Sequence, residues 1–131
     1  MDVLADTNVV SELVKPHPNP GVERALAAVE RVYLSTITME EIMFGLSRNP
    51  NPRLRALYER MFAQRVAMIP VSPEIAKRAG ELRGGFERQG LVRAPADMMI
   101  AATAAMHGLT LLTRDVSHFT ECGIQVVNPF G

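Results

Sequence analysis

Short apolar runs rich in β-branched residues alternate along the chain with segments whose apolar residues recur every three or four positions. Short runs of the first kind are typical of buried strands, and the second spacing is typical of helices with one buried face. This alternation predicts an α/β fold built from βαβ units around a parallel sheet. We expect strands near residues 2–5, 32–36, 67–71, 110–113 and 124–127.

Apolar stripes mark the helices expected between these strands. The residues at helical spacing are Val22, Leu26 and Val29; Met39, Ile42, Met43 and Leu46; Leu54, Leu57, Tyr58 and Met61; and Ile75, Ala79, Leu82 and Phe86. We interpret each of these four stripes as the core-facing side of a helix. A further, largely buried helix is predicted by the segment APADMMIAATAAM, which is rich in Ala, Met and Ile throughout.

Proline and glycine support these boundaries. The segments KPHPNPG and RNPNPR alternate proline with polar residues, so we expect surface connections there. Ser72 followed by Pro73 predicts a helix start, because serine caps helices and proline suits their first turn. Gly108 predicts a helix end. The chain of 131 residues has no internal repeat or linker-like segment, so we expect a single domain spanning residues 1–131.

Composition narrows the class of protein. Cys122 is the single cysteine of the sequence, which excludes disulfides within the chain and cysteine-rich zinc sites. No apolar run approaches the length of a membrane span, and the first twenty residues carry acids where a leader peptide would be basic and then apolar. We therefore expect a soluble, cytoplasmic protein that does not bind membranes.

The charges balance overall but not locally. Acidic and basic residues number 14 each, so the net charge gives no general attraction to nucleic acid. Between Arg48 and Arg65, however, five arginines face one acid, Glu59. Arginine suits forked contacts with phosphate or carboxylate. This run is either a solvated helix face or a surface for RNA or a partner protein, with Arg48, Arg53 and Arg55 as candidate contacts.

Acidic residues fall where packing normally favours apolar or turn residues. Asp6 ends the first expected strand, and Asp115 lies just past the fourth. Asp97 lies in the first turn of the Ala-rich helix, and Glu41 lies in the first turn expected for the helix after VYLSTIT. In a parallel α/β sheet, the carboxyl ends of the strands and the amino ends of the following helices share the edge where ligands bind. The fold therefore predicts that these four acids gather at one edge.

Four carboxylates at one place predict a cation site. They repel one another, so at least one pKa should rise unless a cation lies between them. Oxygen ligands favour a hard divalent ion, Mg²⁺ or Mn²⁺, which keeps several of its waters. The chemistry that follows is metal-assisted attack of water on a phosphodiester.

Each acid also has a purely structural interpretation. Glu41 could form a capping box with Thr38, Asp97 could interact with the helix dipole, and Asp115 could be a turn residue. Asp6 is the hardest to explain in this way, because no glycine turn follows it. Taken together, the positions of the four acids are much harder to explain by these structural roles than the position of any one acid is.

Two other functions remain open from the residues alone. An aspartyl-phosphate phosphatase also places an aspartate at the end of its first strand, but its D-x-D pattern is broken here by Asn8, and lysines are few. A non-catalytic interaction module could use the acids to bind an arginine of a partner. Histidines provide no competing metal site, because their spacing matches no metal motif: His17, His107 and His118.

The sequence resembles the PIN-domain ribonucleases, and among them the VapC and FitB type toxins of bacterial toxin–antitoxin pairs. Four segments carry the resemblance: LADTNVVSEL, LSTITMEEIMFGL, PADMMIAATAAMHGLTLLTRD and VVNPFG. Within them, the D-T-N motif covers residues 6–8, T-x-x-E covers 38–41, D-x-x-I-A-A covers 97–102 and T-x-D covers 113–115.

The resemblance implies a three-layer α/β/α fold with a central, short-stranded parallel sheet. It implies that Mg²⁺ or Mn²⁺ is held by a catalytic quartet: Asp6, Glu41, Asp97 and Asp115. It also implies supporting hydroxyl and amide groups: Thr7, Asn8 and Thr113. The expected activity is that of a toxin that cleaves RNA. The expected partners are a second copy of the chain and a cognate antitoxin, whose tail occupies the site and often places an arginine at the acids.

Overall fold

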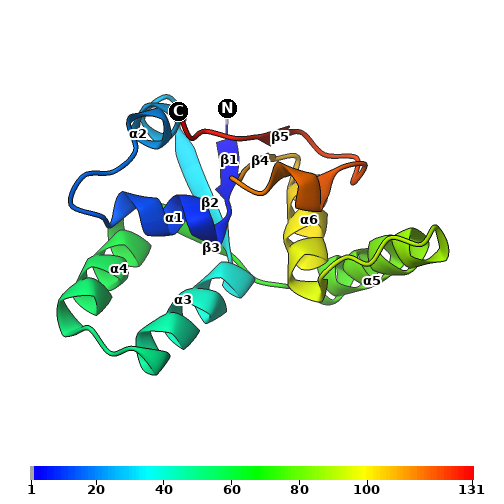
Figure 1. Ribbon diagram of the computed structural model, residues 1–131, viewed down its shortest axis with the longest axis horizontal. Helices are drawn as coiled ribbons and strands as arrows, with labels where there is room; N and C mark the ends of the chain where they lie inside the picture. Colours follow the sequence, from blue (N-terminus) through cyan, green and yellow to red (C-terminus); the bar gives the residue numbers. More distant parts are fainter. Residues whose placement is uncertain (1) are drawn as a thin grey trace.

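The structure is a computed structural model that describes residues 2–131. Five parallel strands form one sheet in the order β3-β2-β1-β4-β5, at the centre of the molecule in Figure 1. The strands are β1 (Asp2–Ala5), β2 (Arg31–Ser35), β3 (Val66–Ile69), β4 (Thr110–Leu112) and β5 (Val126–Val127). All five expected strands are confirmed, with ends shifted by at most two residues.

Helices connect these strands. They are α1 (Thr7–Leu13), α2 (Pro20–Ala27), α3 (Thr36–Arg48), α4 (Pro52–Gln64), α5 (Pro73–Arg88), α6 (Pro95–His107) and the short 3₁₀ helix η1 (Val116–Phe119). The predicted cap at Ser72 is confirmed, because its side chain accepts from the backbone N–H of Ile75. Gly108 ends α6 in the left-handed conformation, as predicted. Within residues 2–131, no helix has the length and apolar composition needed to cross a membrane.

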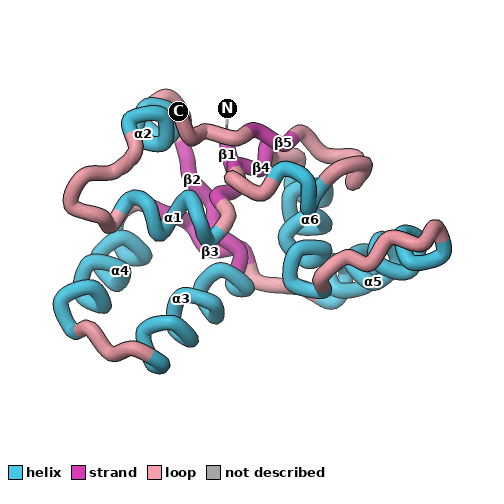
Figure 2. The backbone as a smooth tube through the Cα atoms, in the orientation of Figure 1, coloured by secondary structure: helices cyan, strands magenta, loops and turns pink. Residues whose placement is uncertain are grey.

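Side chains of β1 enter two separate cores, one on each face of the sheet. Leu4 belongs to the core with α5 and α6, whereas Val3 and Ala5 belong to the core with α1, α2, α3 and α4. This alternation follows from the strand geometry, in which successive side chains point to opposite faces. Figure 2 shows α5 and α6 on one side of the strands and α1, α3 and α4 on the other. The predicted three-layer α/β/α architecture is confirmed.

Helix α1 was not predicted from the sequence. Thr, Asn and Val have modest helix propensity, which hid the helix. Asp6 caps it, because its side chain accepts from the backbone N–H of Thr7 at 2.9 Å. Val9 and Val10 are buried against the sheet, and such tertiary packing stabilises a helix of only seven residues. The cap holds the residues after Asp6 at the edge of the sheet.

Three details of the expected helices are wrong. Ser35, not Thr38, caps α3, so the capping box does not form and Glu41 lies in the second turn instead of the first. Val29 lies beyond α2, which ends at Ala27. Leu57 is 37% exposed, so it does not belong to the buried stripe of α4.

The order of the strands places a functional edge next to β1. From β1 the chain moves outward through β2 to β3, and it then returns to β4 on the other side of β1. In open α/β sheets, ligands bind outside the carboxyl ends of the strands at the point where the strand order reverses. Asp6 follows β1 at this point, and Asp115 lies shortly after β4.

Candidate active site

Asp6 is buried at the edge of the sheet, and its carboxylate has two firm donors. One oxygen accepts from the Thr7 backbone N–H at 2.9 Å, and the other accepts from the Thr113 hydroxyl at 2.7 Å. Burial raises the pKa of Asp6, and the charge of Asp115 raises it further, while the two hydrogen bonds oppose these effects. The buried acid therefore has hydrogen-bond donors even though no basic residue follows it closely in the sequence.

Asn8 connects α1 to the segment after β4. Its side-chain N–H group donates to an Asp115 carboxylate oxygen at 3.1 Å and lies 3.4 Å from the Thr113 hydroxyl. Its carbonyl oxygen accepts from the Arg114 backbone N–H at 3.0 Å. The first turn of α1 thus fixes the position of Asp115.

Thr7 brings the acid of α3 to the same edge. Its hydroxyl donates to a Glu41 carboxylate oxygen at 2.5 Å and lies 3.3 Å from the Thr38 hydroxyl. Thr38 is buried, whereas Glu41 is exposed. The hydroxyl of Thr7 therefore joins two helices that follow different strands.

Asp97 approaches from the other face of the sheet. It lies in the first turn of α6, as predicted, and its side chain is 25% exposed. Burial raises its pKa most, followed by the negative charge of Asp6, and the charges of Glu41 and Asp115 act in the same direction. The charges of the other three acids therefore all act on Asp97. We call these four residues the acidic group: Asp6, Glu41, Asp97 and Asp115.

His118 is a site residue that the sequence reasoning missed. Its Nδ1 lies 3.3 Å from a carboxylate oxygen of Asp97, and its side chain is 54% exposed. The sequence suggested only that the histidines form no metal motif of their own. His118 lies on η1 and Asp97 on α6, so the fold is needed to bring them together, and local spacing carries no signal of the contact.

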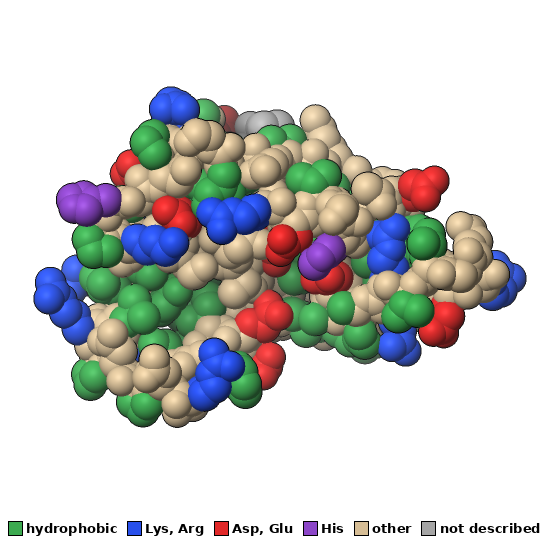
Figure 3. Space-filling model, in the orientation of Figure 1, with side chains coloured by type: hydrophobic (Ala, Val, Ile, Leu, Met, Phe, Trp, Pro, Cys, Tyr) green, Lys and Arg blue, Asp and Glu red, His purple; other side chains and the backbone are tan. Residues whose placement is uncertain are grey.

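The acidic group is an open set of oxygen donors. Figure 3 shows acidic side chains and a histidine side by side near the middle of one face of the molecule. Within residues 2–131, no three His, Cys, Asp or Glu side chains lie close enough to enclose a metal ion. Carboxylate oxygens nevertheless match a hard ion such as Mg²⁺, which binds through one or two carboxylates and keeps several waters. The acidic group therefore suits an ion that keeps several waters better than an ion fully enclosed by protein ligands.

Two hollows of about 300 Å³ each flank the acidic group. One is lined by Thr7, Glu41 and Arg48 among others, and the other by Arg93, Asp97 and His118 among others. Both hollows contain an acid and an arginine, so each combines a negative and a positive group beside the same sheet edge.

The three candidate arginines lie in different surroundings. Arg48 lies over the ring of Phe44 and lines the hollow beside Glu41. Arg55 pairs with Glu59 at 3.2 Å on the exposed side of α4, which is the solvated arrangement considered for this run. Arg53 lines a separate groove.

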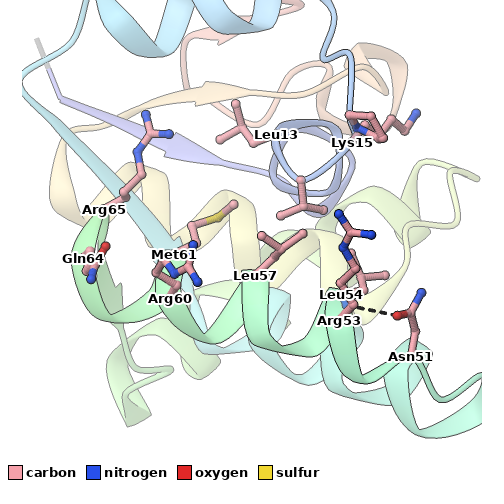
Figure 4. Close-up of a pocket in the computed structure, with 12 residues that line it drawn as sticks. Leu13, Lys15, Asn51, Arg53, Leu54, Leu57, Arg60, Met61, Gln64 and Arg65 are labelled. Carbon is pink, nitrogen blue, oxygen red and sulfur yellow. Dashed lines mark hydrogen bonds between the residues drawn. The ribbon is translucent and has the colours of Figure 1, made fainter.

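This separate groove, of about 600 Å³, lies between the end of α1 and α4 (Figure 4). Leu13 and Leu57 point into it from opposite sides. Its apolar lining includes Leu13, Val14, Leu54, Leu57 and Met61, and its basic residues are Lys15, Arg53, Arg60 and Arg65. We call it the α1–α4 groove. None of the acidic group lines it, so it is a surface distinct from the candidate active site.

Residues 3–121 match the sequence profile of the PIN domain. The chain belongs to the PIN-domain family. The VapC ribonuclease Y4jK of Sinorhizobium fredii is 33% identical over 136 residues, which cover 98% of this chain and 97% of the relative. The toxin FitB of Neisseria gonorrhoeae is 36% identical over 138 residues, which cover 98% of each protein. The crystal structure of FitAcB from Neisseria gonorrhoeae has a TM-score of 0.81 at 37% identity, again covering 98% of each chain.

In this PIN domain, the D-T-N motif connects most of the acidic group. Asp6 is itself an acid of the group, Thr7 donates to Glu41, and Asn8 donates to Asp115. Asp97 instead lies beside His118 of η1, outside the motif. The arrangement presents several carboxylates with fixed orientation at a sheet edge, which is suited to binding a cation and to orienting a water molecule.

Proposed function

We propose that this PIN domain is a metal-dependent endoribonuclease that acts as the toxin of a toxin–antitoxin pair. One observation carries the proposal: hydrogen bonds of Thr7, Asn8 and Thr113 bring Glu41, Asp115 and Asp6 to the switch point of the sheet, where the charges of these three acids act on Asp97. The relationship to a VapC ribonuclease and to the toxin FitB supports the same activity. The reaction is the hydrolysis of phosphodiester bonds of RNA in the cytoplasm.

The acidic group would hold Mg²⁺ or Mn²⁺ through its carboxylate oxygens. Such an ion lowers the pKa of a bound water and stabilises negative charge on phosphoryl oxygens. Its charge also offsets the repulsion among the acids.

The chain itself contributes orientation. Thr7, Asn8 and Thr113 donate to the acids and keep their oxygens directed toward one edge. Preorganised groups of this kind stabilise a transition state because they need little rearrangement during the reaction. Arg48, which lines the hollow beside Glu41, would bind a phosphate of the RNA chain.

The α1–α4 groove provides a surface for the antitoxin. An apolar floor with a basic rim is complementary to an amphipathic helix that carries acidic residues on its flanks. Binding there leaves the tail of the antitoxin free to reach the acidic group and to place an arginine at the acids. We extend the proposal to a homodimer of this chain, as its resemblance to the toxins implies.

Cleavage assays with antitoxin-free protein test the activity. We expect the protein to cleave single-stranded or structured RNA with Mg²⁺ or Mn²⁺ and to lose the activity with a chelator. Asp97→Asn should lower the rate by at least about 100-fold, because a neutral amide replaces a charged oxygen donor of the acidic group. Gel-resolved time courses of RNA cleavage measure both effects.

Adjacent glutamates offer a matched control. Glu41→Gln should lose activity, whereas Glu40→Gln should cleave like the wild type, because Glu40 is exposed and outside the acidic group. The proposal fails if the antitoxin-free protein cleaves no RNA with either metal, or if Asp97→Asn cleaves as fast as the wild type.

A further inference from the structure

Three members of the acidic group are bonded by the D-T-N motif or by Thr113, but Asp97 is not. Among residues 2–131, His118 is the side chain that lies at ion-pair distance from Asp97, with its Nδ1 3.3 Å from a carboxylate oxygen. A carboxylate can only accept hydrogen bonds, so a hydrogen bond across this contact requires the proton to be on the Nδ1 of His118. His118 thus lies beside Asp97 where a donor could orient its carboxylate, as the Thr7 hydroxyl orients that of Glu41.

Arg93 holds His118 in place. Its guanidinium donates to the backbone carbonyl of His118 at 2.8 Å and to the hydroxyl of Thr120 at 3.0 Å. The same group lies 4.1 Å above the centre of the Phe86 ring, on α5. The guanidinium is thus bonded on its edge and stacked on its face, so it ties η1 to the core between α5 and α6. The chain of contacts runs from Phe86 through Arg93 and His118 to Asp97.

We propose that the Nδ1–H of His118 donates to Asp97 and positions its carboxylate, and that Arg93 maintains this arrangement by clamping η1. The inference rests on the proposed nuclease function and adds two residues to it. Partners that orient a ligating or reacting carboxylate matter nearly as much as the carboxylate itself, and their loss typically lowers activity or metal affinity about 10- to 100-fold. Without His118, Asp97 would have no side-chain donor among residues 2–131 to fix its rotamer.

Two substitutions of His118 test whether its N–H donor is what matters, because asparagine keeps such a donor and leucine removes it. In asparagine, the side-chain N–H group is the same number of bonds from the backbone as Nδ1 of histidine. His118→Asn should therefore keep most of the activity, while His118→Leu should lower kcat by about 10- to 100-fold. The KM for RNA should stay unchanged in both variants, because a positioning residue acts through Asp97 and not on the substrate. His17→Leu, in an exposed loop, is the matched control and should behave like the wild type.

Two measurements report on the contact without activity. The ¹⁵N shifts of the His118 imidazole at pH 8.5, where a free imidazole is neutral, should show the proton on Nδ1. In Asp97→Ala this preference should disappear. Calorimetry with Mn²⁺ and metal-free protein should give a dissociation constant about 10-fold weaker for His118→Leu than for His118→Asn.

Arg93 is tested by a change that keeps its charge. Lysine is a point charge without the planar fork, so it cannot donate to His118 and Thr120 while stacked on Phe86. Arg93→Lys should lower kcat as His118→Leu does, and the double variant should be no worse than either single one. A melting temperature within a few degrees of the wild type would show that the loss does not come from unfolding.

The outcomes are decisive in each case. Equal loss in His118→Asn and His118→Leu, or a raised KM with unchanged kcat, would overturn the positioning role. A proton on Nε2 in the wild type would also overturn it. If the wild type cleaves no RNA, the proposed function fails, and the imidazole shifts still decide whether His118 positions Asp97.

Discussion

Burial sets the acidity of Asp6 and Asp97. Both carboxyl groups have raised pKa values, and the largest cause in each is the loss of water on folding, with neighbouring acids adding to it. The sequence predicted a raised pKa from crowding alone. The pKa values of Asp6 and Asp97 are raised as expected, but the loss of water on folding contributes more to the rise than repulsion between the acids does. In the metal-free protein, the charged forms of both groups are therefore disfavoured relative to the unfolded chain.

Stability of the metal-free protein should depend on pH through these two groups. When the folded pKa of a carboxyl group lies above its unfolded value, its contribution to the free energy of unfolding is present at low pH. That contribution is lost as the pH rises through the folded pKa. A cation that binds the charged acids offsets this loss. We expect Mn²⁺ to raise the melting temperature more at pH 8 than at pH 5, as measured by thermal melts at matched ionic strength.

A neutral substitution provides the control for this pH dependence. Asp97→Asn removes one of the two groups, so its Mn²⁺-induced shift should differ less between the two pH values than that of the wild type. The same variant without metal should melt higher than the wild type at pH 8. Equal Mn²⁺ shifts at both pH values in the wild type would argue against a shared acidic site.

The residues of the D-T-N motif could be singled out from sequence because their types do not suit their positions. Asp6 at a strand end and Asn8 where no glycine turn follows both require an explanation beyond packing. His118 could not be found in this way, since an exposed histidine on a short helix is ordinary. Its role depends on Arg93, whose stacking on Phe86 is a tertiary contact without a local pattern.

At the scale of elements, α2 depends on a glycine that allows the end of the chain to pack against it. Asn19 caps α2, accepts from the backbone N–H of Gly131 at 3.1 Å and donates to the Gly131 carbonyl at 3.1 Å. A Cβ at Gly21 would lie 2.3 Å from the carbonyl oxygen of Pro129 and 2.8 Å from the Gly131 nitrogen. Both contacts are with backbone atoms, which cannot move away without breaking the Asn19 contacts.

Alanine at two glycines should therefore have opposite effects. Gly21→Ala should lower the free energy of unfolding by about 1 to 3 kcal/mol, the usual cost of overpacking. Gly80→Ala on α5 should raise it by up to about 1 kcal/mol, because alanine favours helices and a Cβ there meets no atom within 4 Å. Urea unfolding curves measure both. Equal stability of Gly21→Ala and Gly80→Ala would contradict the close packing of residues 128–131 on α2.

A helix or strand can be predicted from the sequence where its local pattern of apolar residues matches the residues that are buried in the fold. In α5, the stripe that includes Ile75, Ala79 and Phe86 is buried, and the cap at Ser72 stabilises the helix that carries it. The sequence of α1 does not indicate a helix, because its β-branched residues favour strands. The helix forms there with the help of the Asp6 cap and the packing of Val9 and Val10 on the sheet. The fifth strand shortens to Val126–Val127 for a similar reason, since the backbone pairing with β4 decides its length.

At the scale of the whole molecule, two surfaces are separated by α1. The acidic group lies beside the first turn of α1, and the α1–α4 groove begins at its last turn. Figure 3 shows the hydrophobic side chains of a recess between α1 and the α3–α4 pair, apart from the acidic side chains. A partner that fills the groove therefore needs only a short further segment to reach the acids. The proposed inhibition and the proposed cleavage should therefore respond to separate substitutions.

Leu57→Glu should separate these two properties. Leu57 is 37% exposed on the floor of the α1–α4 groove, so a glutamate there should fold normally and repel an acidic, amphipathic helix. We expect the affinity for the cognate antitoxin to fall at least about 10-fold, while RNA cleavage by the antitoxin-free variant stays at the wild-type rate. Leu91→Glu is the matched control, because Leu91 is 41% exposed outside the groove. Titration of the antitoxin against RNA cleavage measures both variants, and equal inhibition of Leu57→Glu and wild type would exclude the groove as the antitoxin site.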